Sequence, residues 1–186
     1  KLPMLSGVLD LIQPANSGDD EFTQFLAHTP DVQYIFFRQL PSIHLVQSLP
    51  SATLRRLDFT HQEDTEVDWA SLLHACSFPV LTQLHLYSKR AHPLPPHLST
   101  FAPLVTKLKL DGFSLCDDSF STLPSGLQSL ALRGLPSLWR EADLLLLAQR
   151  CPGLTELKIV MPNPHNWDLA QFEPLRTLSV LSSLRV

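Results

Sequence analysis

Glycine is scarce in this sequence, with six residues in a chain of 186. Loops that hold phosphate groups depend on closely spaced glycines, and the chain contains neither a P-loop motif nor a G-x-G-x-x-G motif. A G-x-S-x-G motif around a nucleophilic serine is also absent. These absences argue against the common nucleotide-binding and hydrolytic enzymes. The sequence therefore predicts neither catalytic residues nor a cofactor.

Cysteine is equally scarce: Cys76, Cys116 and Cys151 lie far apart and outside any C-x-x-C motif. Widely spaced cysteines in odd number favour buried, reduced thiols over disulfides. The chain has no N-x-S/T sequon, and its eight histidines form no H-x-x-x-H pair of the kind that binds zinc. We therefore expect no metal site and an intracellular setting, cytoplasm or nucleus, where thiols stay reduced.

An excess of basic residues is missing as well, because 14 Lys and Arg face 18 Asp and Glu for a net charge of −4. A general binder of nucleic acid or of anionic membrane would show the opposite balance. No apolar run approaches the roughly 20 residues of a membrane span. The first residues are interrupted by Pro3 and Gly7, unlike the apolar core of a signal peptide. The partner that we expect is a protein, not nucleic acid or a membrane.

Leucine, in contrast, is abundant and regularly placed. The stretch LQSLALRGL (residues 127–135) puts apolar residues at positions i, i+3 and i+5, which suits one approach residue followed by a short strand. Seven full copies of this template begin at Val32, Leu54, Leu81, Val105, Leu127, Leu154 and Leu175. A partial copy, Leu9 and Leu11, precedes them with an implied first position at Ser6. Successive full copies begin 21 to 27 residues apart, so the chain is predicted to consist of repeats.

Two further features recur along the chain: a proline before each full copy and, in several repeats, a helical pattern. A proline stands one to four residues before every full copy and ends whatever precedes it. Helices are predicted over residues 20–28, 68–77, 141–151 and 166–172, since each opens with an acidic residue or Asn and carries apolar residues at helical spacing. One helix per repeat is expected.

Acidic clusters are predicted to belong to helix starts and loops. Asp19 to Glu21, and the pair Asp117 and Asp118, are expected to begin helices, where negative charge complements the dipole. The run of Glu63, Asp64, Glu66 and Asp68 lacks the turn glycine of a calcium loop. It is predicted to be a solvated loop that ends with Asp68 as an N-cap.

The segment KRAHPLPP (residues 89–96) is rich in proline. Its Pro-x-Pro-Pro run favours an extended turn that would suit a proline-binding partner. The alternative is a rigid connector that replaces the helix of its repeat.

The repeats resemble those of leucine-rich-repeat proteins over essentially the whole chain. Within that family, RCPGLTELKI (residues 150–159) and SLCDDSFSTL (residues 114–123) are similar to the cysteine-containing repeats of F-box-type substrate receptors, with Cys151 matching the first cysteine. The resemblance implies an α/β leucine-rich-repeat solenoid: a curved right-handed coil with a parallel sheet on the concave face and helices or irregular turns on the convex face. Residues 1–186 would form one such domain, expected to be a segment of a longer chain.

In such a fold, positions i+2, i+4 and i+6 point to the concave face. The predicted partner-binding residues there are Tyr34, Phe36, Arg38, Arg56, His85, Tyr87, Lys107, Lys109, Arg133 and Lys158. Aromatic residues and arginine are enriched at binding hot spots, although these aromatics can instead pack across strands on one another or on an adjoining domain. The basic residues suit an acidic or phosphorylated peptide, or form an ordinary solvated face.

The predicted function is therefore to bind another protein. The resemblance implies, more narrowly, the substrate-recognition part of an F-box-type ubiquitin-ligase adaptor, with the ligase core held by a domain outside this segment. Two alternatives stay open: a structural scaffold in a larger assembly, and a ligand-sensing domain of a receptor or immune protein.

Overall fold

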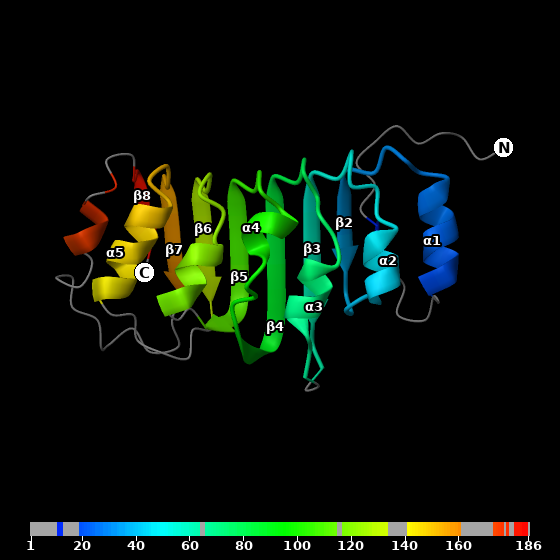
Figure 1. Cartoon of the computed structure of the whole chain (residues 1–186), viewed down its shortest axis with the longest axis horizontal. Coiled ribbons are helices and arrows are strands. Elements are labelled where there is room, and N and C mark those ends of the chain that lie inside the picture. The colour runs from blue at the N-terminus through cyan, green and yellow to red at the C-terminus, as the bar shows by residue number, and fades with distance from the viewer. Residues whose placement is uncertain are drawn as a thin grey trace.

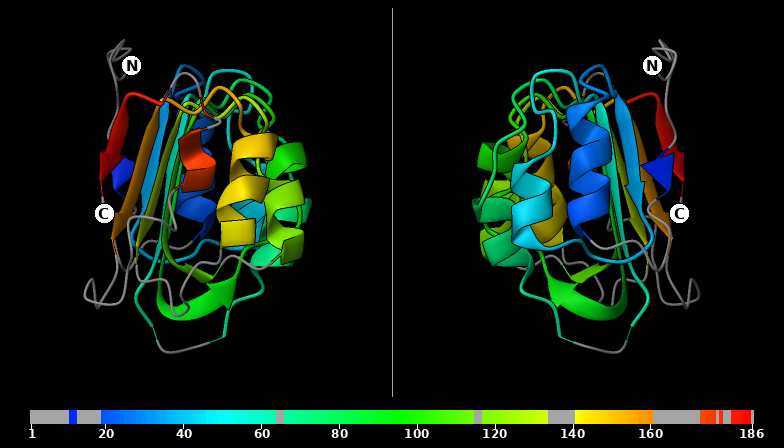
Figure 2. Two further views of the ribbon diagram at one scale, coloured as in Figure 1. Left: turned by 90° about the vertical axis from the view of Figure 1, so that its left-hand side faces the viewer. Right: turned by 90° about the vertical axis from the view of Figure 1, so that its right-hand side faces the viewer.

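A computed structural model shows a layer of parallel strands covered on one side by a layer of helices (Figures 1 and 2). The structure describes residues 11–12, 19–63, 66–114, 117–133, 141–160, 173–176, 178 and 181–185. In these residues one eight-stranded sheet runs in sequence order, and every neighbouring pair of strands is parallel. The expectation of an α/β fold is confirmed.

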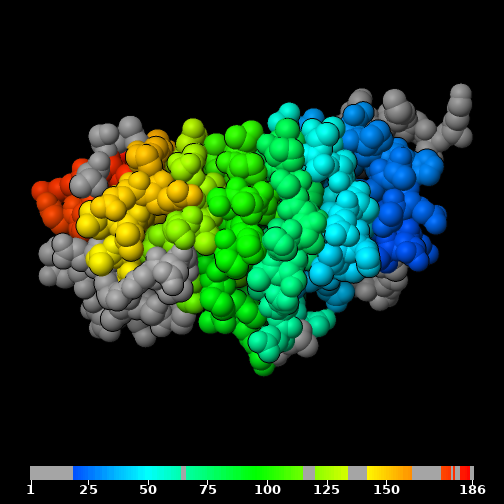
Figure 3. Space-filling view, in the orientation of Figure 1, coloured from blue at the N-terminus to red at the C-terminus, as the bar shows by residue number. Residues whose placement is uncertain are grey.

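The strands of the sheet are β1 (Leu11–Ile12), β2 (Tyr34–Phe37), β3 (Arg56–His61), β4 (Gln83–Pro93), β5 (Lys107–Ser114), β6 (Ser129–Arg133), β7 (Glu156–Val160) and β8 (Ser183–Arg185). The helices are α1 (Asp19–Ala27), α2 (Ile43–Gln47), α3 (Trp69–His74), α4 (Leu98–Phe101), the 3₁₀ helix η1 (Asp117–Thr122) and α5 (Glu141–Arg150). Figure 3 views the molecule from the helix side, and consecutive segments follow one another along its long axis.

The apolar template determines which residues of each strand enter the core. Leu57, Leu84, Leu108, Leu130 and Leu157 pair side by side across β3 to β7, and all are buried. The positions two residues later are filled by Phe59, Leu86, Leu110, Leu132 and Ile159, which are buried in the same way. For the repeats from Val32 to Leu154, the predicted core positions are therefore confirmed.

Aromatic side chains run through the N-terminal part of this core. Phe37 stacks on Phe59 with ring centroids 5.5 Å apart, and Trp69 meets Phe113 edge to face at 5.2 Å. Each buried side chain of this size contributes about 1.5–3 kcal/mol to stability, and an aromatic pair adds about 0.5–1.5 kcal/mol. Beyond β5 the described core positions of the sheet hold aliphatic residues instead.

Three of the four predicted helices are present at the expected places, as α1, α3 and α5. Asp68 caps α3 as predicted, because its carboxylate accepts a hydrogen bond of 2.9 Å from the backbone N–H of Ser71. Helices also begin at Asp19 and Asp117, as the acidic clusters indicated. The fourth predicted helix, residues 166–172, lies outside the described residues.

The segment 89–96 differs from both predictions made for it. Strand β4 continues to Pro93, with His92 beside Phe113 on β5, and α4 follows, so this repeat keeps its helix. Gly112 makes the longer pairing possible: its φ is 81°, and a Cβ there would collide with the carbonyl oxygen of Ser88. The proline-rich sequence therefore forms the irregular end of β4, because prolines are tolerated where strand pairing ends.

The template was assigned wrongly at both ends of the sheet. At the N-terminal end, Leu11 pairs with Ile35 and so occupies position i+3, two residues away from its predicted alignment with Phe37. At the C-terminal end, Leu184, not Leu178, pairs with Leu157. Leu175 and Leu178 are buried, but they lie in successive turns, with Leu178 N–H bonded to Leu175 O and Leu181 N–H to Leu178 O.

The physical reason is that a three-residue apolar spacing suits such turns as well as it suits the approach to a strand. In LSVLSSLRV (residues 178–186) both patterns overlap. Consequently Leu181, predicted on the concave face, takes the first core-side position of the last repeat instead. Thr177, Ser179 and Val180 lie outside the described residues.

The cysteines in the described part of the chain are free thiols. Cys151 is buried, as predicted, and its Sγ lies 3.7 Å from the carbonyl oxygen of Pro124 in the preceding repeat. Burial raises the pKa of the Cys151 thiol to about 11, so it is an inert packing residue. Cys76 is only partly buried, and Cys116 lies outside the described residues. No helix in the described residues combines the length and apolarity that crossing a membrane requires.

Candidate binding site on the open sheet face

The face of the sheet opposite the helices, here called the open face, carries the side chains that alternate with the core. One row across it contains Tyr34, Arg56, Gln83, Lys107, Ser129 and Glu156. The next row contains Phe36, Asp58, His85, Lys109, Ala131 and Lys158. Neighbouring strands lie about 4.8 Å apart, so side chains that adjoin within a row can touch. The predicted site residues Tyr87 and Arg133 lie farther along β4 and β6, and Arg38 directly follows β2.

A shallow depression of about 260 Å³ lies in the middle of the open face, over β3 to β6. It is lined by Arg56, Asp58, Gln83, Leu84, His85, Lys107, Leu108, Lys109, Ser129 and Ala131. The hollow arises because the small side chains of Ser129 and Ala131 stand beside the long Lys107 and Lys109. Of the ten predicted site residues, four line it: Arg56, His85, Lys107 and Lys109.

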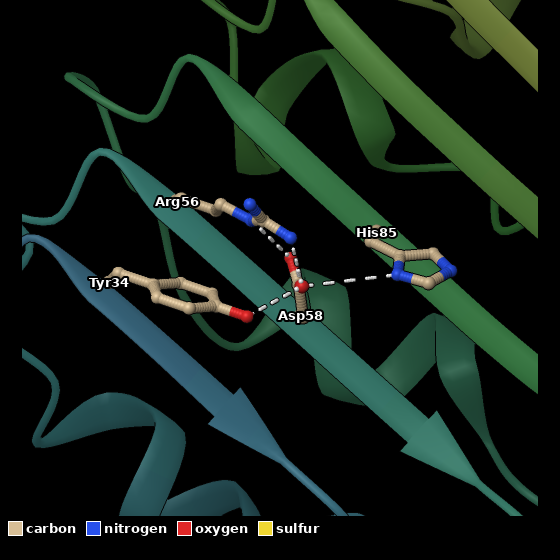
Figure 4. A network of polar contacts seen from close by, with 4 residues as sticks. All are labelled: Tyr34, Arg56, Asp58 and His85. Carbon is tan, nitrogen blue, oxygen red and sulfur yellow. Dashed lines mark hydrogen bonds and ion pairs between the residues drawn. The ribbon is translucent and has the colours of Figure 1, made fainter. Parts of the chain in front are cut away.

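One wall of the depression is a network centred on the carboxylate of Asp58 (Figure 4). Arg56 donates from Nε to Oδ1 at 3.1 Å and from a terminal guanidinium nitrogen to Oδ2 at 2.7 Å. The Tyr34 hydroxyl donates to Oδ2 at 3.0 Å, and the Arg56 guanidinium lies 4.4 Å from the centre of the Tyr34 ring. His85 Nδ1 is 3.9 Å from Oδ2, within ion-pair distance but beyond a hydrogen bond. These four residues are the Asp58 cluster.

The Asp58 cluster neutralises a carboxylate that is almost removed from solvent, with 4% of the side chain exposed. Burial raises the pKa of Asp58, but the neighbouring His85 ring and Arg56 guanidinium outweigh burial and lower the pKa below its ordinary value. The carboxylate is therefore ionised and paired. Tyr34 therefore contacts Arg56 and Asp58 on the neighbouring strand, and its role in binding a partner stays a prediction.

The opposite wall of the depression carries cations without such partners. No carboxylate of the described residues lies within ion-pair distance of Lys107 or Lys109. Lys109 is partly buried, and this burial lowers the pKa of its ammonium group. The positive charge of Arg133 lowers the same pKa further, while Asp111 and Asp58 partly oppose the shift. The two lysines are thus donors with unused hydrogen-bonding capacity.

The other charged residues of the open face do not line the hollow. Glu156 accepts a hydrogen bond of 2.8 Å from the Ser129 hydroxyl. The inner nitrogen Nε of Arg133 is buried without a hydrogen-bond partner in the described residues. The other six predicted site residues do not line the depression: Tyr34, Phe36, Arg38, Tyr87, Arg133 and Lys158.

The charge balance of the open face differs from that of the chain. At the template positions of β3 to β7, five Arg and Lys residues (Arg56, Lys107, Lys109, Arg133 and Lys158) accompany three acids (Asp58, Asp111 and Glu156), an excess of two positive charges. The chain as a whole has a net charge of −4. Its basic residues are therefore concentrated on this face, which favours an anionic ligand.

The sequence prediction omitted Asp58, Gln83, Ser129 and Ala131 from the site. A signal for Asp58 was available, because it lies two residues after Arg56 and therefore on the same side of the strand. The hollow depends on neighbouring small and large residues across β5 and β6, which becomes visible only once the register is known. In the described part of the chain, no group of three His, Cys, Asp or Glu side chains is arranged to hold a metal ion.

No model of a known protein family matches the chain, and a search of curated proteins finds no match.

Proposed function

We propose that this chain is a leucine-rich-repeat solenoid whose open face binds an acidic segment of a partner protein. Two features support the solenoid: strands that pair in sequence order, and principal contacts between elements that join neighbours along the chain. In such an architecture the sheet face free of helices is the surface that repeats commonly present to ligands.

The observation that carries the binding proposal is the depression with Lys107 and Lys109 on one wall. Each ammonium group can donate to a carboxylate or phosphate oxygen, and charge-assisted hydrogen bonds are about twice as strong as neutral ones. Because Asp58 is already paired with Arg56, it offsets these two charges only in part. An anion placed in the hollow would meet donors that otherwise have only water.

The narrower proposal is the substrate-recognition part of an F-box-type ubiquitin-ligase adaptor. It is supported by the RCPGLTELKI segment, in which buried Cys151 joins its repeat to the preceding one. A structural scaffold and a receptor or immune sensor are the competing roles. Purification of the protein from its native cells, with its bound proteins identified by mass spectrometry, separates them: a ligase core with variable partners supports the adaptor, and one fixed assembly without ligase subunits excludes it.

The test of open-face binding uses two double variants of equal net charge. Lys107→Gln with Lys109→Gln removes two positive charges from the depression, and Gln24→Glu with Gln47→Glu adds two negative charges to exposed positions on α1 and α2. Both variants change the net charge by −2. We expect the first to lose the partners captured by the unaltered protein and the second to keep them.

Quantitative mass spectrometry of the captured proteins measures both effects. Equal loss from the two variants would mean that overall charge, not the open face, governs capture. Retention of every partner by the lysine variant would exclude the depression as the binding site. Thermal unfolding of each variant confirms that the comparison is made between folded proteins.

A further inference from the structure

The free positive charge of the depression is concentrated on one strand. Lys107 and Lys109 are two residues apart on β5 and point to the same face, so their Cα atoms lie about 6.8 Å apart. Two flexible lysine stems at that separation can converge on one small anion. A single group with two negative charges satisfies both ammonium ions at once, whereas one carboxylate neutralises only one of them.

The surroundings oppose a long run of carboxylates. Asp111 follows two residues after Lys109 on the same strand and face, and Glu156 stands beside Ser129 on β7. Asp58 forms the wall opposite the lysines. A partner segment with several spaced acidic residues would place some of them against these carboxylates, and like charges at close range are destabilising. A compact dianion between the two lysines avoids that repulsion.

A third donor site faces the same hollow. His85 lies beside Lys109 across the β4–β5 pair and lines the depression, and 20% of its side chain is exposed. Its Nδ1 is directed at Asp58, while Nε2, on the side of the ring turned away from Asp58, is buried without a hydrogen-bond partner in the described residues (Figure 4). Asp58 close to Nδ1 favours a proton on that nitrogen, and Nε2 donates to a phosphate oxygen in the doubly protonated ring, because a phosphate dianion has no O–H of its own.

We infer that the acidic group recognised in the depression is a phosphate monoester on a partner protein, namely phosphorylated serine or threonine. The inference rests on the proposed function and specifies its ligand. Lys107 and Lys109 neutralise the dianion, and His85 bonds a third oxygen. Asp58 acts as a positioning residue, because its contacts with Arg56 and Tyr34 hold the wall on which His85 stands.

The experiment compares three degenerate peptide libraries with identical flanking positions that lack Asp and Glu. The central residue is phosphoserine, serine or glutamate, and binding is measured by fluorescence anisotropy. We expect the phosphoserine library to bind at least tenfold more tightly than the other two. Replacing Lys107 and Lys109 with glutamine removes two charge-assisted bonds and should weaken its binding by about a hundredfold or more. The control Lys158→Gln removes one positive charge, half of the change in the double variant, from the open face outside the depression and should change binding by less than about twofold.

Each other outcome overturns the inference in a recognisable way. Equal binding of the glutamate and phosphoserine libraries overturns the phosphate inference and leaves the acidic-segment proposal intact. Binding of none of the libraries overturns both. Equal weakening by Lys158→Gln shows general attraction to a basic face and overturns the site. If a single-stranded oligonucleotide binds more tightly than the phosphoserine library, the two lysines recognise phosphodiesters and the inference is overturned. Millimolar inorganic phosphate, added as a competitor, should displace the phosphoserine library and leave any binding of the serine library unchanged.

Discussion

Two neighbouring parts of the open face differ in whether their charged side chains are paired. On β2 to β4, the carboxylate of Asp58 is enclosed by a guanidinium, a phenol and an imidazole that come from three adjacent strands. On β5, one strand away, Lys107 and Lys109 have no such partners in the described residues. Both parts lie on the same kind of strand, over the same row of buried leucines.

The difference follows from how deeply each charged group is buried. A buried carboxylate is costly unless it is paired and hydrogen-bonded, so the Asp58 cluster must satisfy itself for the sheet to fold. Half-exposed lysines carry no comparable requirement, because water can solvate them in the free protein. The paired charges of the Asp58 cluster stabilise the sheet. The ammonium groups of Lys107 and Lys109 can still donate hydrogen bonds to a ligand.

The largest expected effect is on the stability of the core, and it tests whether the two parts of the open face differ only at the surface. Leu57 under the Asp58 cluster and Leu130 beside the lysine strand occupy the same core row, and both are fully buried. Leu57→Ala and Leu130→Ala should each reduce the free energy of unfolding by about 2–5 kcal/mol. Urea unfolding followed by circular dichroism measures both. A difference of more than about 3 kcal/mol between them would mean that the two regions already differ in the core.

A smaller effect is expected from Asp58→Asn, which removes the charge but keeps the shape of the side chain. Arg56 loses its ion pair, but 45% of its side chain is exposed and can be solvated, so we expect a loss of about 1–3 kcal/mol. Asp111→Asn is the matched control on the lysine strand, and it should change stability by less than about 0.5 kcal/mol. The comparison breaks down if the two substitutions have equal effects in urea unfolding.

The pH dependence of stability tests the same comparison between the Asp58 cluster and the lysine strand. The pKa of Asp58 is lowered in the folded state, because the His85 and Arg56 contacts exceed the opposing effect of burial. Because the pKa of Asp58 is lowered by folding, the ionised carboxylate stabilises the fold at pH values above 3.8, the ordinary pKa of the group. This stabilisation is lost as the pH falls through the folded pKa. The stability difference between the unaltered protein and Asp58→Asn should therefore shrink as the pH falls below about 4. A difference that grows as the pH falls below about 4 would contradict the assigned network.

Much of this arrangement could be predicted from sequence wherever a residue's own spacing determines its place. Leu108 and Leu130 follow a spacing that suits a short strand and that recurs in successive copies, so their burial and their alternation with Lys109 and Ala131 were predictable. The pattern failed at Leu178, where the same apolar spacing also suits turns, and at Leu11, whose pairing with Ile35 shifts the template by two residues. It failed again at residues 89–93, because the strand extends there through the positive φ of Gly112, which pattern alone does not reveal.

Ten site residues were predicted on one face from their alternation, and four of them, including Arg56 and Lys107, line the depression. Which of them are neutralised depends on cross-strand neighbours separated by more than 20 residues in the chain, such as Tyr34 and Asp58. That information lies in the register between strands, and register is a tertiary property.

The smallest expected effect concerns Lys109 itself, and it separates a binding residue from a structural one. Its ammonium is partly desolvated and repelled by Arg133, so its charge adds little to folding and slightly opposes it. Lys109→Gln should leave the free energy of unfolding within about 0.5 kcal/mol of the unaltered protein, with a gain more expected than a loss. Urea unfolding at low and high salt tests this, because salt should reduce any gain by screening the same repulsion. A loss above about 1 kcal/mol would show that Lys109 has a structural partner and would remove the contrast with Asp58. If stability is unchanged while the phosphoserine library binds more weakly, the charge of Lys109 serves the ligand and not the fold.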